Sequence, residues 1–143
     1  LICCKPTYHS RYLPYELNTD HIDLTDTSYG IWYLDMMDHM ERYEGKTVSF
    51  LAMALVPPRF PSGFFVPGRM AMTCCADDIA FVGMLAKLPA VVDSSLLKSR
   101  AWVWVTATVK IEYQKEYKGK GPVLYATKLE RAEEPLEKTV YFT

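Results

Sequence analysis

A small, mainly β barrel with one helix packed on it is the fold class that three observations predict. A single helical period comes first, over 29–43, and the apolar pattern then changes to a period of two. Turn residues divide this second part into five strand-sized segments, with a short helical segment between the third and the fourth. This order of elements is that of the oligonucleotide/oligosaccharide-binding (OB) barrel. We therefore predict an OB-like five-stranded barrel with an N-terminal helix and a short helix between strands three and four.

The composition is that of one globular domain without a strong electrostatic field. Half of the 143 residues are apolar or aromatic, which is enough for one hydrophobic core. Sixteen basic residues oppose seventeen acidic ones, so no global charge draws the chain to nucleic acid or anionic lipid. No apolar run approaches the roughly 20 residues that span a bilayer. Because the chain starts at Leu1, we expect a fragment of a longer protein, whose membrane anchor would lie outside it.

The predicted helix follows an irregular segment, 1–27, that prolines interrupt. Residues just before the helix can cap its N-terminus, and Gly45 can end it. We therefore divide the chain into this segment and a helix-plus-barrel domain, 28–143, with an extended C-terminal tail. The residues at helical spacing are Tyr29, Tyr33, Met36, Met37, Met40 and Tyr43, and the cap candidates are Asp26, Thr27 and Ser28.

Five strands are predicted after the helix, bounded by prolines, glycines and aspartates. Asp77 and Asp78 form a tight turn after the second strand, Asp93 caps the short helical segment 93–100, and 118–121 form a turn before the fifth strand. The predicted strands cover 46–56, 64–75, 79–88, 102–113 and 123–132.

Two tryptophans alternate with the apolar side of the fourth strand. Val103 and Val105 face the predicted core, so Trp102 and Trp104 face outward. Such a pair could stack on the bases of single-stranded nucleic acid, but Lys110 is the one basic residue on that face. We favour coverage of both tryptophans by the helix or by the N-terminal segment, because large aromatic residues are usually buried at least in part.

Adjacent cysteines in "TCCADD" allow two interpretations. With regular alternation, Cys74 shares a face with Met70 and Met72, and Cys75 lies on the other face with Arg69. The favoured interpretation makes Cys74 a core residue beside the two methionines and places Cys75 under the N-terminal segment. In the alternative, thiolates bind zinc or another soft metal, or sense redox state. The candidate ligands are Cys74, Cys75, Cys3, Cys4 and His9.

Catalysis is not expected from this sequence. No nucleophile, metalloprotease or phosphate-loop motif is present. His21 lies between aspartates in a predicted loop, and His39 is expected to be solvated among Asp35, Asp38 and Arg42. No cofactor other than the possible soft metal is predicted.

Four segments together carry a resemblance to a known family. They are "YEGKTVSFLAMAL" (43–55), "FVPGRMAMTCCADDIAFVGMLA" (65–86), "WVWVTATV" (102–109) and "PVLYATKLERAEEPLEKTVYF" (122–142). Over about 30–143 the chain resembles the bacterial YcgQ-type family of permease subunits, whose C-terminal region is a domain of unknown function. The most specific part of the pattern comprises Phe65, Arg69, Thr73, Cys74, Cys75 and Asp78.

The resemblance implies a context and no chemistry. It implies that the full-length protein lies at the cell membrane beside a partner permease subunit, and that this part of it is soluble. We therefore expect a non-catalytic module that binds a partner protein or a small ligand. The alternatives are a metal-binding or thiol redox-sensing domain and, less favoured, a single-strand nucleic-acid binder; no nucleic-acid partner is expected. The predicted ligand or partner surface comprises Arg69, Trp102, Trp104, Asp77 and Asp78.

Overall fold

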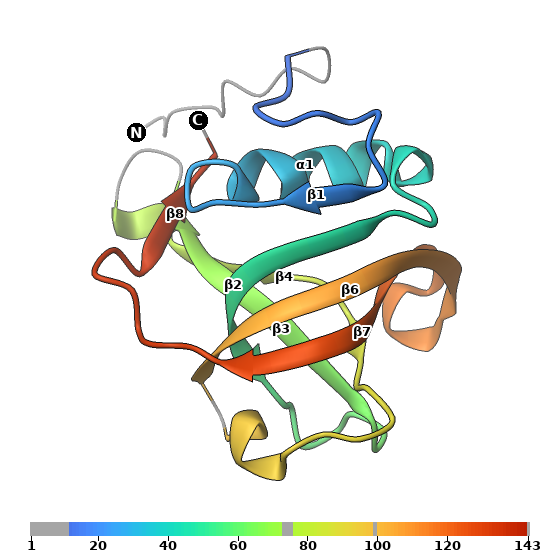
Figure 1. Ribbon diagram of the computed structural model, residues 1–143, viewed down its shortest axis with the longest axis vertical. Helices are drawn as coiled ribbons and strands as arrows, with labels where there is room; N and C mark the ends of the chain where they lie inside the picture. The colour runs from blue at the N-terminus through green and yellow to red at the C-terminus, as the bar shows by residue number, and fades with distance from the viewer. Residues whose placement is uncertain (1–11, 73–75, 99, 143) are drawn as a thin grey trace.

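A computed structural model describes residues 12–72, 76–98 and 100–142 of the chain (Figure 1). The described residues contain one α-helix, α1 (Tyr29–Asp38), and short 3₁₀ turns at Met40–Arg42, Ala76–Asp78, Ser94–Leu97 and Lys115–Tyr117. They also contain eight strands: β1 (His21–Asp23), β2 (Thr47–Leu55), β3 (Phe64–Met72), β4 (Ala80–Gly83), β5 (Ala86–Lys87), β6 (Ala101–Gln114), β7 (Gly119–Arg131) and β8 (Thr139–Tyr141).

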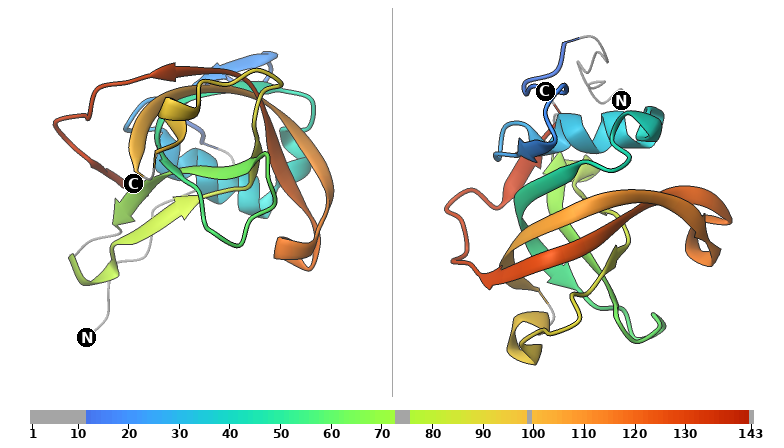
Figure 2. Two further views of the ribbon diagram at one scale, coloured as in Figure 1. Left: turned by 90° about the horizontal axis from the view of Figure 1, so that it is seen from below. Right: turned by 45° about the vertical axis from the view of Figure 1, so that its right-hand side comes forward.

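Five of these strands close into a ring. β2 pairs with β3 and with β6, β6 with β7, and β3 with β5, all antiparallel. The parallel pair β5–β7 completes the circle, so the strands curve around a common interior (Figure 2). Short 3₁₀ turns at Ser94–Leu97, capped by Asp93, precede β6 as predicted. This topology is that of an OB barrel and confirms the predicted fold.

The interior of the barrel follows the period-two pattern of the strands. Val103, Val105 and Val109 of β6 are buried, and their neighbours point outward. β2 alternates in the same way from Thr47 to Leu55. A β-bulge lies in the β6–β7 pairing at Thr106 and Ala107, where the extra residue increases the twist that a closed barrel needs.

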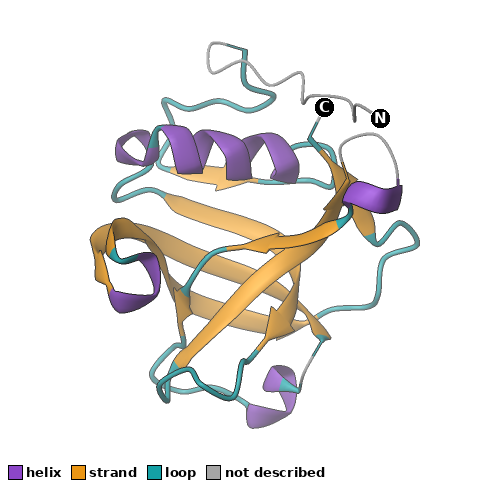
Figure 3. Ribbon diagram, turned by 180° about the vertical axis from the view of Figure 1, so that it is seen from behind, coloured by secondary structure: helices purple, strands orange, loops and turns teal. Residues whose placement is uncertain are grey.

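Helix α1 covers one end of the barrel, as Figures 1 and 3 show. The Tyr29 and Trp32 rings lie 5.6 and 5.3 Å from that of Phe50 on β2. Such ring pairs add to the free energy gained by burying apolar area. The predicted packing of the helix on the barrel is therefore confirmed. Within the described residues, no helix is long and apolar enough to cross a membrane.

The buried face of α1 differs from the predicted stripe. Trp32 and Asp35 are completely buried, whereas Met37 is 42% exposed. The helix has a second contact surface, because Gly30 lies against the backbone of β8. A Cβ atom at Gly30 would come within 2.3 Å of the Tyr141 carbonyl oxygen. The helix also ends earlier than predicted, at Asp38, where the chain turns into the 3₁₀ segment.

Three strand predictions need correction. The segment 1–27 contains β1, which pairs parallel with β2, and the extended tail contains β8, which pairs parallel with β3. Local sequence patterns cannot reveal such short strands, because distant partners create them. The predicted strand 79–88 is divided into β4 and β5, which pair with different parts of β3.

Candidate functional site

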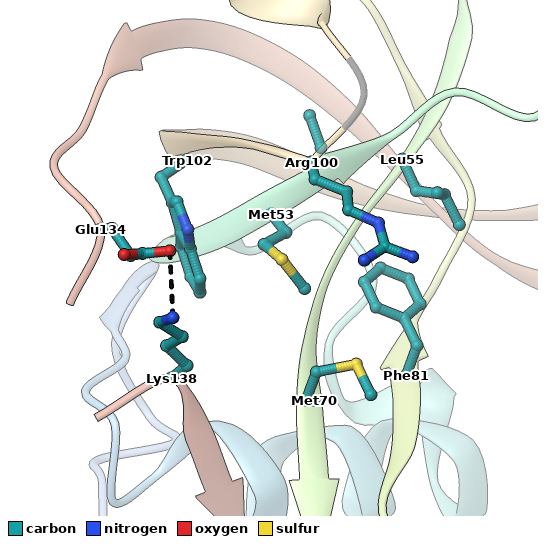
Figure 4. Close-up of a pocket in the computed structure, with 9 residues that line it drawn as sticks. Met53, Leu55, Met70, Phe81, Arg100, Trp102, Glu134 and Lys138 are labelled. Carbon is teal, nitrogen blue, oxygen red and sulfur yellow. Dashed lines mark ion pairs between the residues drawn. The ribbon is translucent and has the colours of Figure 1, made fainter. Parts of the chain in front are cut away.

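A groove of about 480 Å³ lies on the outer face of the barrel. It forms where β2 and β3, which are paired only between 53–55 and 66–68, diverge. The C-terminal tail provides its rim. The lining residues, shown in Figure 4, are Met53, Ala54, Leu55, Met70, Phe81, Arg100, Trp102, Glu134 and Lys138.

Two cross-strand pairs form most of the apolar lining. Met53 of β2 stands opposite Trp102 of β6, and Met70 of β3 stands opposite Phe81 of β4. All four side chains are partly exposed, because they occupy the outward positions of strands whose alternate residues fill the core. Methionine side chains adapt readily to the shape of a ligand, so the groove combines rigid rings with adaptable thioethers.

Arg100 contributes a guanidinium to one end of the groove (Figure 4). Within the described residues, this group makes no hydrogen bond or ion pair. Its backbone has a φ of 65°, in the left-handed region that favours glycine. A hydrogen bond of 2.8 Å from the Arg100 amide to the Ala54 carbonyl oxygen holds this conformation beside β2.

The C-terminal tail closes the other end of the groove. The Ala132 amide donates to the Trp102 carbonyl oxygen at 3.0 Å, which fixes the start of the tail. Lys138 Nζ then lies 3.4 Å from Glu134 Oε1 at the rim. Both side chains are more than half exposed, so this pair contributes little to stability while it neutralises the lysine.

Arg69 lies behind Trp102 and is only 1% exposed. Its guanidinium donates to the Asp26 carboxylate at 2.8 Å and to the Glu137 carbonyl oxygen at 3.1 Å. The guanidinium carbon lies 5.2 Å from the centre of the Trp102 ring, within cation–π distance. The prediction of Arg69 as a surface residue for a ligand or partner is therefore wrong, because its polar contacts join three parts of the fold.

Trp104 is 49% exposed, so the expectation that both tryptophans are covered is wrong for this residue. Helix α1 closes one end of the barrel (Figure 1). Trp104, Leu51 and Arg69 border a second hollow of about 270 Å³. Trp102, in contrast, is half-buried beside Arg69 and the groove. The structure thus separates the two tryptophans into neighbouring hollows.

The predicted aspartates do not join the groove. Asp77 and Asp78 lie in the 3₁₀ turn at Ala76–Asp78, in agreement with the predicted tight turn. Asp77 is exposed, and neither residue lines the groove. The predicted surface is therefore divided: Trp102 lines the groove, and the acidic turn lies elsewhere.

The metal prediction rests on residues outside the described part of the chain, namely Cys3, Cys4, His9, Cys74 and Cys75. Between 12–72, 76–98 and 100–142, no group of three or more potential metal ligands occurs. The predicted core partners of Cys74 can be placed: Met70 and Met72 are both partly exposed, whereas Ala71 between them is buried. That face of β3 is therefore the outer face, which corrects the expectation that the two methionines belong to the core.

A buried polar network near α1 was not expected from the sequence. Asp35 is completely buried and accepts a hydrogen bond of 2.5 Å from the Tyr43 hydroxyl. Arg42 Nη1 lies 3.2 Å from the same carboxylate, and the Tyr15 hydroxyl lies 2.5 Å from that of Tyr43. Burial raises the pKa of Tyr15 to about 12, and burial together with the bond to Asp35 raises that of Tyr43 further.

The histidines lie apart from the groove. His39 is partly exposed at the end of α1, with its Nδ1 atom 3.8 Å from a Glu41 carboxylate oxygen. His21 belongs to β1 and not to a loop; its Nε2 atom lies 2.9 Å from Ser49 Oγ and 3.1 Å from Asp23 Oδ1. Ser49 and Asp23 both contact the same ring nitrogen of His21, whereas a Ser–His–Asp triad places these two partners on opposite nitrogens.

A known family model covers nearly the whole chain. The family model described as the DUF1980 C-terminal domain matches residues 5–142, which begins earlier than the predicted resemblance over 30–143. The match confirms that the chain is a domain of unknown function. It does not show that the full-length protein is a permease subunit. No curated protein matches the chain.

Comparison with solved structures gives distant likenesses. A chain of a replication protein A heterotrimer bound to single-stranded DNA is 12% identical, with a TM-score of 0.34, and the match covers 62% of this chain and 58% of that one. A protein described as an aspartyl-tRNA synthetase from Leishmania major Friedlin is 14% identical, with a TM-score of 0.42, and the match covers 94% of this chain and 24% of that one. The aspartyl-tRNA synthetase from Entamoeba histolytica is 12% identical, with a TM-score of 0.39, and the match covers 95% of this chain and 29% of that one. The matched region is therefore just over half of the first chain and about a quarter of each synthetase.

Proposed function

The chain belongs to the DUF1980 C-terminal domain family, and from this premise we propose that it is a non-catalytic module that binds a small apolar ligand in the groove beside Trp102. One observation carries the proposal: a concave volume of about 480 Å³ lined by thioethers and aromatic rings. Small-molecule sites are typically roughly 300–1,000 Å³ in volume and mostly apolar, with few polar groups. The groove has these properties.

The size of the groove sets the affinity we expect. A two- to three-ring probe that buries roughly 200 Å² of its own apolar surface, and a little over half as much of the groove, gains about 9 kcal/mol from buried area and ring contacts together. Association costs at least about 4 kcal/mol of this. The remaining 5 kcal/mol or so corresponds to a dissociation constant of hundreds of micromolar. Binding should therefore be measurable by fluorescence.

The side chains of the groove support a binding role without catalysis. The described lining residues supply thioethers, rings, two cations and one carboxylate. A hydroxyl, thiol or imidazole that could act as an activated nucleophile or general base is not among them. Glu134, the carboxylate, is exposed and paired with Lys138, unlike the buried carboxyl groups that active sites use for proton transfer.

The partner is proposed from the resemblance to YcgQ-type permease subunits. In the full-length protein, the module would lie beside a permease subunit in the same membrane and present the groove or its ligand to it. Co-purification of the tagged full-length protein from detergent-solubilised cells tests this part. Stoichiometric recovery of a polytopic membrane protein supports it, and recovery of the tagged protein alone contradicts it.

Groove binding is tested with N-phenyl-1-naphthylamine, a neutral apolar dye that fluoresces when it leaves water. When wild-type protein is titrated into the dye, we expect saturable binding with a dissociation constant of hundreds of micromolar. The variant Met70→Trp places a bulky ring in the groove and should weaken binding at least tenfold, because the ligand volume is filled. Met37→Trp, on the exposed side of α1, is the matched control and should bind as the wild type does.

Two results would overturn the assignment of the groove. The first is absence of saturable binding by a wild-type protein whose circular dichroism spectrum shows a folded β protein. The second is equal weakening in Met70→Trp and Met37→Trp, which would place the dye elsewhere or indicate non-specific unfolding.

A further inference from the structure

We infer that the ligand of the groove is an anionic amphiphile, whose negatively charged head group pairs with Arg100 and whose apolar body lies between the Met53–Trp102 and Met70–Phe81 pairs. The inference rests on the proposed function, because it names the ligand class of the same groove. It adds the head-group charge, the residue that recognises it and the direction in which the ligand lies.

The charges of the groove leave one cation uncompensated. Its charged lining residues are Arg100, Lys138 and Glu134. Lys138 and Glu134 pair with each other at 3.4 Å, and Arg100 has no such partner within the described residues. The lining therefore carries a net charge of plus one, which is complementary to a monoanion.

A guanidinium suits the recognition of an anionic head group better than an ammonium would. Its planar donors can bind both oxygens of a carboxylate at once, and the apolar wall beside it reduces competition from water. Figure 4 shows the Arg100 guanidinium directed toward the Phe81 ring and away from the Glu134–Lys138 pair. A bound anion at Arg100 would thus have its apolar body next to the rings, with the far end toward the tail.

The backbone at Arg100 supports a role for its side chain. Its φ of 65° is a conformation that glycine adopts without strain and other residues adopt at a cost. Hydrogen bonds on both sides over-determine it: the Arg100 amide donates to the Ala54 carbonyl oxygen at 2.8 Å, and the Ala101 amide to that of Lys98 at 2.9 Å. Strained positions of this kind cluster at ligand-binding sites, and this one directs a guanidinium along an apolar wall.

Neighbouring cations do not offer the same recognition. Arg69, on the other side of Trp102, is 1% exposed and bonded to Asp26 and to the tail. Its donors are directed into the fold and not into the groove. Recognition of the head group is therefore assigned to Arg100.

Two dyes of the same ring skeleton test the inference. 8-Anilino-1-naphthalenesulfonate differs from N-phenyl-1-naphthylamine by one sulfonate. We expect the wild type to bind the anionic dye about tenfold more tightly than the neutral one, the usual size of a charge-assisted hydrogen bond. In Arg100→Gln this preference should disappear while neutral-dye binding is unchanged. Arg59→Gln, an exposed arginine in the 56–63 loop, is the matched control and should keep the preference.

Competition identifies the natural chemistry of the head group. Decanoate should displace the neutral dye at lower concentration than decanol does, and Arg100→Gln should remove this difference. Vesicles of phosphatidylglycerol that displace the dye where free decanoate does not would overturn the inference of a free amphiphile and point to a lipid surface.

The outcomes separate the inference from the proposed function. Equal affinities for the two dyes, or a preference that survives in Arg100→Gln, overturn the anionic ligand class while the apolar groove stands. Failure of both dyes to bind the folded wild type overturns both proposals.

Discussion

Two arginines near Trp102 have opposite surroundings. Arg69 is buried, with a carboxylate at 2.8 Å and a backbone carbonyl oxygen at 3.1 Å. Arg100 is exposed and lies along an apolar wall without a polar partner within the described residues. A buried charge must be paired to be tolerated, so Arg69 is explained by the fold. The exposed guanidinium of Arg100 is hydrated and needs no partner for stability, so its charge is available to a ligand.

The same contrast extends to the regions around the two residues. Near α1, Asp35 is completely buried but bonded to Tyr43 and Arg42. Across the groove, the apolar pairs remain partly exposed to water. One region pairs its buried charged groups within the fold, and the other has apolar surface and one cation available. Substitutions should therefore change stability in the first region and binding in the second.

The largest effect is expected from Arg69→Met. The change keeps much of the side-chain volume but leaves Asp26 and the tail carbonyl groups without their donor. Loss of one partner of a buried ion pair costs roughly 3–5 kcal/mol, and because Asp26 is 47% exposed we expect about 3 kcal/mol. Urea unfolding followed by tryptophan fluorescence measures it. A change below about 0.5 kcal/mol, the usual size for a surface substitution, would show that the contacts of Arg69 do not stabilise the fold.

A smaller loss is expected from Tyr43→Phe. The hydroxyl group is the donor that lies 2.5 Å from the buried Asp35 carboxylate, and removing a hydrogen bond to a charged group costs about 1.5–3 kcal/mol. We expect a loss of about 2 kcal/mol in the free energy of unfolding, with the affinity for the neutral dye unchanged in the folded protein. Weakened dye binding by the folded variant would show that the two regions are coupled.

Arg100→Gly should change ligand binding and leave stability intact, in contrast to Arg69→Met and Tyr43→Phe. Glycine relieves the strain of a positive φ, worth about 1–2 kcal/mol, but loses roughly 0.5–1 kcal/mol through its greater freedom in the unfolded chain. We therefore expect stability to stay equal or rise by up to about 1 kcal/mol, while the preference for the anionic dye is lost. Thermal unfolding and dye titration of one sample give both values. A clear loss of stability would assign Arg100 a structural role like that of Arg69.

The smallest effect is an alkaline loss of stability near α1. The pKa of Tyr15 is raised to about 12 by burial, while that of a tyrosine in the unfolded chain is about 10. The unfolded state then loses its proton first, so stability is constant below pH 10 and falls as the pH rises toward 12. At pH 10.5 we expect Tyr15 to account for about 0.5 kcal/mol of this loss, after allowance for its partial exposure.

The variant Tyr15→Phe isolates this contribution. Urea midpoints at pH 8 and 10.5 should fall less in the variant than in the wild type. Identical shifts would indicate that lysine deprotonation or the other tyrosines cause the whole alkaline loss.

The sequence predicts the barrel well because its strands carry their own signal. The alternation of Val103 and Val105 with two tryptophans can be seen without knowing which strands pair with β6. The turn residues then separate one strand from the next. β1 and β8 lack such a signal, since each has three residues and exists through a distant partner. The buried face of α1 was missed for a related reason: Gly30 packs against Tyr141, at the far end of the chain.

The groove could be predicted only in part. The outward position of Trp102 follows from alternation. For Met70, the sequence predicts a core position that the structure corrects, because period two does not say which face of β3 is inside. Arg69 and Arg100 look alike in the sequence, and only tertiary contacts distinguish the paired one from the unpaired one. Arg100 was the last residue of the predicted segment 93–100, where its backbone conformation could not be anticipated.

The central claim, that the groove is the binding site, is tested most directly by methyl NMR of the seven methionines. Titration with N-phenyl-1-naphthylamine should shift the methyl signals of Met53 and Met70, which line the groove. The signals of Met36 and Met84, which are buried outside it, should remain in place. Unchanged signals from Met53 and Met70 at saturating dye, or equal shifts of all seven, would contradict the account.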